Sequence, residues 1–363
     1  MSYNNFLGQD GFIWFVGVVE DRQDPTYTGR VRVRCLGYHT DNKIDLPTSD
    51  LPWASPVLPI TSSGISGIGH TPTGLLEGSW VFGFFRDSQY AQEPVILGSL
   101  PGRPSEIAKS SKGFYDPNEV YPRYINEPDT NRLAVNNEDN PHLGLELRKS
   151  TRITGLPTAD FDATTAADGS SISASDTDTW AQPEIAYNAV YPYNHVTETE
   201  SGHVLEFDDT STAERIYLAH KTGTSTEYNP NGDLVNIIKG TQYTLTSADN
   251  KVNIDGLSDI TIGGRHKIYI NKDGAADNNY DIQVGPNANI NIQVDQGDIN
   301  LVTKKEGRIN VNADGDYNVK VGGNYTLEVE GNMLENVTGA NSTRTSNTSG
   351  AVIHRGATID LNP

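Results

Sequence analysis

The residues best suited to acid and base chemistry gather between positions 195 and 210. Five carboxylates lie in this short segment: Glu198, Glu200, Glu206, Asp208 and Asp209. Hydrolysis of a glycosidic bond requires a carboxylic acid with a raised pKa in an apolar cleft and a second carboxylate across the bond. The five acids lie instead in turns and alternating strands, which predicts solvent-facing or contact positions. We therefore assign no catalytic residue.

Two histidines in the same segment raise the question of a metal site. His195 and His203 are eight residues apart and have acidic neighbours. Zinc sites usually add cysteines or a histidine pair one helical turn apart, and neither accompanies these residues. Cys35 is the only cysteine, so we expect no disulfide and no cysteine-based zinc site, but a buried thiol in a strand. The histidines are predicted to be structural, and no metal is expected.

Nucleotide and nucleic-acid binding are both disfavoured by the sequence. Ser66–Gly69 has the glycines of a phosphate-binding loop but lacks the Lys-Ser/Thr pair and the helix that complete one, so we predict a tight turn. The formal net charge is -20, whereas binding to a phosphate backbone needs clustered Lys and Arg. We expect neither a cofactor nor a nucleic-acid partner.

The elements that carry these residues are predicted to be β-strands. Hydrophobic residues form only 35% of the chain and glycine is abundant, which favours turn-rich β-structure over helices. Strand patterns occur in Gly11–Val19, Arg30–Arg34, Trp80–Phe85 and Pro94–Gly98. About five strands in so short a segment leave many edges, which closure into a small barrel removes. Residues 1–105 are therefore predicted to form a barrel.

A polar connector is predicted between this barrel and a second β-rich region. Residues 106–183 are rich in Gly and Pro and then in Asp, Thr, Ser and Ala, too polar to form a core of their own. Strand patterns return in residues 184–245, where Gly202–Phe207 and Glu214–Leu218 predict antiparallel pairs and Asn231-Gly232 predicts a turn. No signal peptide and no membrane span is predicted.

A repeat of eight residues covers most of residues 250–340, with interruptions, and defines the predicted C-terminal region 246–363. Its unit is apolar-x-apolar-x-Gly-(Asn/Asp)-x-x, and its clearest copies place Gly315, Gly323, Gly331 and Gly339 at intervals of eight. The same unit occurs earlier at Val252–Gly256 and Ile260–Gly264 and continues as Ile268–Ile270. Looser copies with longer spacings follow at Ile282–Val284, Ile290–Ile292, Ile299–Leu301 and Ile309–Val311. Each unit predicts a short strand with one face inward, followed by a corner that needs the permissive backbone of glycine.

Three chains wound around one axis would account for this repeat. One octad buries only about two side chains, too few to offset the ordering of eight residues. In a three-chain prism the inward Val and Ile side chains meet at the axis, and each strand edge is paired by a neighbouring chain. The alternative is a single-chain solenoid or irregular Gly-rich β-structure.

Many segments resemble the family of T-even-type phage baseplate central spike proteins. In the first hundred residues they are Trp14–Arg22, Asp24-Pro25, Gly29–Arg34, Gly37–His39, Leu51–Trp53, Pro59–Ser62, Ser66–Gly69, Pro72–Gly74 and Glu77-Gly78. Further along they are Gly113–Pro117, Tyr121–Arg123, Tyr187–His195 and Glu198–His203. Together with the octads, the resemblance covers most of the chain except residues 126–183. Similar units occur in the VgrG spikes of type VI secretion.

The resemblance implies an all-β homotrimer with an N-terminal OB-fold barrel and a C-terminal intertwined triple-stranded β-helix, for which residues 184–245 form the entrance. Such a protein is a structural component of the virion tail baseplate, assembled in the host cytoplasm. It pierces the host outer envelope mechanically when the tail contracts. The resemblance also implies that a trimeric hub protein binds the barrel and that a PAAR-repeat protein caps the C-terminal tip.

The sequence departs from this family at two places. The T-even-type spike has a lysozyme domain between barrel and needle, whereas residues 106–183 are too short and too polar for one, so no enzymatic activity is expected. Some related tips bind iron through a His-x-His pair, but here His354 is followed by Arg355 and Gly356. A tip metal is therefore not expected.

Two other functions remain as alternatives. A β-helical tailspike that degrades polysaccharide predicts a carboxylate cluster in a long groove, and a receptor-binding tail fibre predicts tight binding to intact host cells. Neither accounts for the segments of the N-terminal barrel.

Overall fold

The computed structural model describes residues 12–107, 109, 111, 115–136, 164–165, 171–172, 186–258, 260, 262, 264–271, 279–294, 296–305 and 307–338. Apart from strands, the regular secondary structure of these residues consists of one turn of α-helix, α1 (Arg132–Val135), and two 3-10 turns, η1 (Thr48–Asp50) and η2 (Ser88–Tyr90). The predicted all-β class is confirmed. Over the same residues, no helix has the length and apolar character needed to cross a membrane. Contacts divide the chain into one unit of residues 1–158 and 180–263 and another of residues 159–179 and 264–363.

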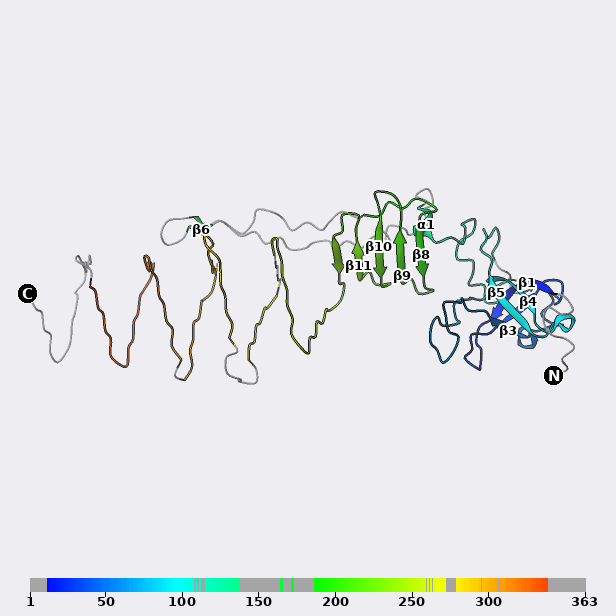
Figure 1. Ribbon diagram of the computed structural model, residues 1–363, viewed down its shortest axis with the longest axis horizontal. Helices are drawn as coiled ribbons and strands as arrows, with labels where there is room; N and C mark the ends of the chain where they lie inside the picture. The colour runs from blue at the N-terminus through cyan, green and yellow to red at the C-terminus, as the bar shows by residue number, and fades with distance from the viewer. Residues whose placement is uncertain are drawn as a thin grey trace, which may run out of the picture. The chain divides into compact units, whose positions relative to one another are not determined.

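Five strands near the N-terminus close into a barrel, drawn in blue and cyan in Figure 1. They are β1 (Trp14–Asp21), β2 (Val31–Cys35), β3 (Trp53–Pro56), β4 (Trp80–Phe85) and β5 (Pro94–Ser99), and their order is β1-β2-β3-β5-β4. All pairs are antiparallel except β3 with β5. The predicted barrel is confirmed, and closure gives each of its strands two neighbours.

Alternation along these strands forms the barrel core. The buried residues of the core are Phe15, Val19, Val31, Val33, Cys35, Ala54, Val81, Phe85 and Ile96. Burial raises the pKa of the Cys35 thiol to about 12, so the predicted buried thiol is confirmed. Packing is tight at Gly83, where an added Cβ would overlap the carbonyl oxygen of Val95 and lie 2.7 Å from Cζ of Phe15.

A second sheet follows further along the same unit, drawn in green in Figure 1. It is an antiparallel meander of β8 (Asn194–Glu198), β9 (Val204–Asp208), β10 (Arg215–Ala219), β11 (Ser225–Tyr228) and β12 (Leu234–Ile237). Three of its turns contain glycines with positive φ: Gly202, Gly223 and Gly232. The predicted antiparallel pairs and the Asn-Gly turn are therefore confirmed.

One face of this second sheet is covered by α1 and the segment 186–190. Asn131 caps α1 by accepting a hydrogen bond from the Leu133 backbone N–H at 2.9 Å. The Leu133 carbonyl in turn accepts from the Tyr187 hydroxyl at 2.7 Å and from Nδ2 of Asn194 at 3.1 Å. A small core forms between cover and sheet, made of Leu133, Tyr187, Ala189, Val204 and Tyr217.

Beyond β12, the described residues up to 338 contain no strand or helix. The chain runs in extended segments that reverse direction at bends, drawn from yellow to orange in Figure 1. Bends fall at the predicted corners Gly256, Gly315, Gly323 and Gly331. The predicted reason was wrong, because φ at these glycines lies outside the left-handed region and an added Cβ would meet nothing within 4 Å. Left-handed φ values in this region belong instead to Asn271, Asn287, Gly297 and Lys305.

Several sequence predictions fall outside the described residues. They include Gly339, the tip residues His354, Arg355 and Gly356, and most of the connector 106–183. Within that connector, β6 (Thr164–Thr165) and β7 (Ser171–Ile172) form a two-stranded antiparallel pair.

Candidate assembly surfaces

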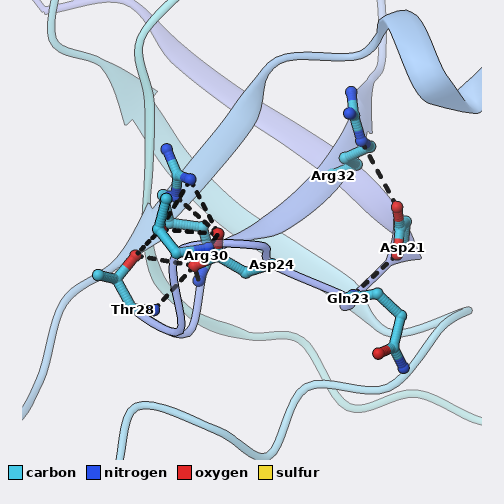
Figure 2. Close-up of polar contacts among 7 residues, drawn as sticks. Asp21, Gln23, Asp24, Thr28, Arg30 and Arg32 are labelled. Atoms are coloured by element: carbon cyan, nitrogen blue, oxygen red, sulfur yellow. Dashed lines mark hydrogen bonds and ion pairs between the residues drawn. The ribbon is translucent and has the colours of Figure 1, made fainter.

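The loop between β1 and β2 is fixed by one carboxylate, which shapes the barrel surface around it (Figure 2). Asp24 accepts hydrogen bonds of 2.8–3.2 Å from the backbone N–H groups and hydroxyls of Thr26 and Thr28 and from the backbone N–H of Arg30. The Arg30 guanidinium also donates to it, with Nη2 at 2.8 Å and Nε at 3.3 Å. The Arg30 hydrogen bond holds the pKa of Asp24 far below its usual value. The loop is therefore anchored by an ionised side chain.

Two arginines of this surface lie over the indole ring of Trp53. The guanidinium carbons of Arg30 and Arg32 are 5.6 and 4.4 Å from the ring centroid. Each arginine also forms an ion pair with an aspartate. Arg30 pairs with Asp24, and Arg32 pairs with Asp21, as Figure 2 shows. Arg30 and Arg32 are each neutralised by an aspartate of the same barrel, so neither is an unpaired cation that could bind a phosphate backbone.

The outside of the barrel exposes an aromatic cluster that sequence reasoning did not single out. Trp14 stacks on Phe82 with ring centroids 5.1 Å apart, and Phe12 lies 4.8 Å from Trp14. Phe84 completes the cluster, 5.1 Å from Phe12 and 6.0 Å from Trp14. Trp14 remains 46% exposed, so the cluster is an apolar surface that water reaches. The available signal was the alternation of aromatic residues in β1 and β4.

The second sheet exposes an apolar face, which we call the outer face. Its residues are Leu205, Phe207, Ile216, Leu218, Tyr228 and Leu234. They are cross-strand neighbours, with Phe207 opposite Ile216 and Leu205 opposite Leu218 on β9 and β10. Leu218 is 58% exposed. An apolar face of this extent on a water-exposed sheet marks an interaction surface.

The opposite face of the same sheet buries a charged network, which we call the polar layer: Asn194, Glu206, Arg215 and Glu227. The Arg215 guanidinium donates to Glu206 at 2.8 Å and to Glu227 at 3.2 Å, and Asn194 donates to Glu206 at 3.0 Å. The side chains of Arg215 and Glu206 are fully buried. Burial raises the pKa of Glu227, since desolvation outweighs the favourable charge of Arg215.

The covered face of the second sheet corrects the prediction for two of the five carboxylates. Glu206 and Asp208 were expected to face solvent or contacts, but both are buried under α1 and the segment 186–190. Alternation along a strand separates two faces without showing which one is covered, and here the cover lies on the polar face. Asp208 accepts from the backbone N–H of Thr210 at 2.9 Å and also from its hydroxyl.

The other residues considered for chemistry lie at the sheet surface. Asp209 faces His195 at 3.7 Å, and both side chains are mostly exposed. His203 accepts a hydrogen bond from the backbone N–H of Lys221 through Nδ1 at 3.3 Å, so its ring holds the end of a hairpin. Glu198 accepts from Nδ2 of Asn131, the cap of α1, at 2.7 Å. In the portion of the chain that the structure describes, no three His, Cys, Asp or Glu side chains converge to hold a metal.

Glu200, at the turn between β8 and β9, joins three parts of the first unit. Its carboxylate accepts from Arg22 of the barrel at 3.0 and 3.2 Å and from the Tyr121 hydroxyl at 2.6 Å. Its backbone carbonyl accepts from Arg123 at 2.6 Å. The Arg22 hydrogen bond lowers the pKa of Glu200. The sequence predicted a solvent-facing or contact position for Glu200, and the structure gives this residue a role in holding the linker.

The predicted tight turn at Ser66–Gly69 is confirmed. Ile65 and Ile68 form an isolated antiparallel bridge across it, and Ser66 and Gly67 both have positive φ. The loop is a surface turn of the barrel region with exposed isoleucines on either side of its tip.

The octad region exposes the apolar positions of its units. Val252, Ile260 and Leu327 are 75%, 80% and 56% exposed, although their spacing is that of inward-facing strand positions. The other exposed members are Ile254, Ile262, Ile268, Ile270, Ile282, Val284, Ile290, Ile292, Ile299, Leu301, Ile309, Val311, Val319, Val321, Val329 and Val337. One chain alone therefore leaves paired apolar side chains uncovered along most of this region.

The barrel, the second sheet and the octad region each expose apolar side chains, and comparison with known proteins specifies the class of protein. The family model described as the Gp5 N-terminal OB domain matches residues 37–184. Protein Gp5 of Vibrio phage KVP40 is 38% identical over 292 residues, which make up 73% of this chain and 66% of that protein. The pre-baseplate central spike protein Gp5 of Enterobacteria phage T4 is 44% identical over 130 residues, 34% of this chain and 22% of that protein.

The chain belongs to the family of T4-type phage baseplate central spike proteins. The name of the T4 relative describes it as a central spike protein of the pre-baseplate. The aligned region spans 66% of the Vibrio phage relative and 22% of the T4 relative.

Proposed function

We propose that the chain is the homotrimeric central spike that pierces the host outer envelope when the tail contracts. The observation that carries this proposal is the exposure of the paired apolar side chains of residues 252–337 in a single chain. Each exposed pair contributes roughly 3–6 kcal/mol when it is buried by neighbouring chains, and more than eight such pairs recur along the segment. Three intertwined chains would cover them and pair every strand edge, which produces a stiff rod.

The outer face of the second sheet supports the same assembly. It presents six large apolar residues to water immediately before the octads begin, so the uncovered apolar surface is continuous in sequence from β9 to residue 337. Around a threefold axis, three outer faces would pack against one another and begin the needle. The function of the rod is then mechanical, because it transmits force through symmetry and stiffness.

The proposed partners follow from the family and from the barrel. A trimeric hub protein would bind the barrel, for which the aromatic cluster of Phe12, Trp14, Phe82 and Phe84 offers an apolar surface. A PAAR-repeat protein would cap the C-terminal tip, and the host outer membrane would be contacted by force and not by charge, given the net charge of -20. No nucleic acid takes part.

We also propose that this spike has no hydrolase of its own. The polar connector 106–183 occupies the position of the lysozyme domain in the T-even-type spike. Incubation of the purified chain with peptidoglycan should release no soluble fragments, while added lysozyme does so in the same sample. Turnover by the chain alone would refute this part of the proposal.

The test of the assembly is the mass of the purified chain by light scattering. We expect a mass near three times 39.5 kDa for the full chain, and a monomer when residues 241–363 are deleted. Ile290→Asn with Ile292→Asn should weaken the trimer, whereas Asn291→Ser on the opposite side of the same segment should not. A full-length monomer, or a trimer insensitive to both changes, would contradict the intertwined needle.

A further inference from the structure

We propose that the polar layer determines which face of the second sheet remains outward, and so keeps the outer face available for self-association. This inference rests on the proposed function, because it explains how the assembly surface is kept open. Asn194, Glu206, Arg215 and Glu227 would act as positioning residues for that surface.

The arrangement of the two faces is the reverse of what an isolated sheet favours. Apolar residues at Leu205, Phe207, Ile216 and Leu218 face water, while a network with one positive and two negative side chains is buried beside Val204 and Tyr217. Turning the sheet over would bury the apolar face and hydrate the charges, which favours the reversed monomer. Buried ion pairs contribute little to stability, so the ion pairs alone do not explain why the polar face is the covered one. Specific contacts between the polar layer and the groups that cover it are needed to hold the observed arrangement.

Those specific contacts involve the polar groups of the cover formed by α1 and the segment 186–190. The Leu133 carbonyl accepts from Nδ2 of Asn194 at 3.1 Å. The Tyr187 ring lies 5.0 Å from the Arg215 guanidinium carbon. Against the apolar outer face these groups of the cover would find no partners, and an unsatisfied buried polar group is costly.

The polar layer also fixes the register of four strands. Its members come one from each of β8, β9, β10 and β11, and Arg215 bridges the carboxylates of its two neighbouring strands. A slip of one residue in any strand would move its member to the other face. The same groups therefore specify both which face of the sheet is covered and the register of its strands.

Two variants of similar volume separate polarity from packing. The apolar variant carries Glu206→Leu, Arg215→Met and Glu227→Leu, and the polar variant carries glutamine at the same three positions. Both are made in full-length chains with Ser225→Cys, a near-isosteric thiol on the buried face. Labelling of this thiol, located by peptide mass spectrometry, reports whether the buried face is still covered; buried Cys35 is the internal reference.

We expect slow labelling of residue 225 in the Ser225→Cys background and in the polar variant. The apolar variant should fold, but with either face of the second sheet under the cover. Labelling of residue 225 should then be roughly tenfold faster or more, because molecules with the reversed sheet become a major population. Light scattering should show one trimeric species for the first two proteins and mixed species for the apolar variant. A matched control, Glu20→Leu with Arg34→Met, removes the fully buried ion pair of the barrel and should leave labelling at 225 unchanged.

Slow labelling of the apolar variant would overturn the inference. So would fast labelling of the polar variant, which keeps the hydrogen-bonding groups. An apolar variant that does not fold at all also contradicts the inference, because the polar layer would then be needed for the stability of the fold and not for the choice of the covered face. If the Ser225→Cys chain is a monomer whose thiol is still protected, the proposed function fails while the facing inference stands.

Discussion

Replacing Asp24 tests how strongly one carboxylate holds the barrel surface. Asp24→Ala removes the acceptor for three backbone N–H groups, of Thr26, Thr28 and Arg30, and for the Arg30 guanidinium. Hydrogen bonds to a charged group contribute about 1.5–3 kcal/mol each, but water replaces part of them at a loop. We therefore expect the free energy of unfolding of the barrel to fall by about 2 kcal/mol, the upper end of the range for losing a capping side chain.

Urea unfolding followed by tryptophan fluorescence measures this change in the full chain. Three of the four tryptophans, Trp14, Trp53 and Trp80, lie in barrel strands, so the signal reports chiefly on the barrel. Glu93→Gln is the control, since it breaks an exposed ion pair with Arg86 that contributes at most about 1 kcal/mol. A loss for Asp24→Ala no larger than that of the control would refute the reasoning.

The pH dependence gives the same experiment a second, independent outcome. The pKa of Asp24 is lower in the folded chain than its ordinary value of 3.8. Its contribution is therefore fully present above that value and is lost as the pH falls through the folded pKa. The difference between wild type and Asp24→Ala should be constant near neutrality and should narrow only in strong acid. A difference that narrows already between pH 7 and pH 5 would contradict this assignment.

Three further predictions concern other described positions. Gly83→Ala should destabilise the barrel by several kcal/mol in the same urea assay, because the new methyl group overlaps the Val95 carbonyl. Cys35 should resist alkylation at pH 8 in the folded chain and react fully in urea, since burial raises its pKa to about 12; reaction without denaturant would contradict its burial. Asp116→Ala should speed hydrogen exchange of the linker amides that its buried carboxylate accepts from, while barrel exchange stays unchanged.

The barrel was predictable because its strands carry their own signals. Alternation in Arg30–Arg34 and apolar runs in Trp80–Phe85 and Pro94–Gly98 match β2, β4 and β5 within one or two residues. The strand β3 was not identified, because it spans only Trp53–Pro56, ends in proline and pairs in parallel with a distant strand. Its formation depends on tertiary pairing that no local pattern records.

The assembly surfaces were only partly predictable, for a physical reason. The sequence locates alternating faces at 204–208 and 215–219 but does not say which face is covered, and the usual rule of polar residues outward fails here. The cover depends on Leu133, which lies 61 residues before Asn194 of β8, and on Tyr187 in the segment that leads into β8. The predicted glycine corners were located correctly, but their backbone explanation was wrong because the bends use ordinary φ values.

The uncovered apolar pairs of residues 252–337 have a consequence for the kinetics of maturation. The barrel and the second sheet close within one chain, so their rates should be independent of protein concentration. Ordering of the later region, under the proposed self-association, is a multimolecular step whose rate increases steeply with concentration. On dilution the two events should separate in time. A long-lived species should then accumulate in which the barrel and the second sheet are folded but the octad region is not yet ordered. The local concentration of chains, and not the rate of folding within each chain, would then limit how fast spikes are completed.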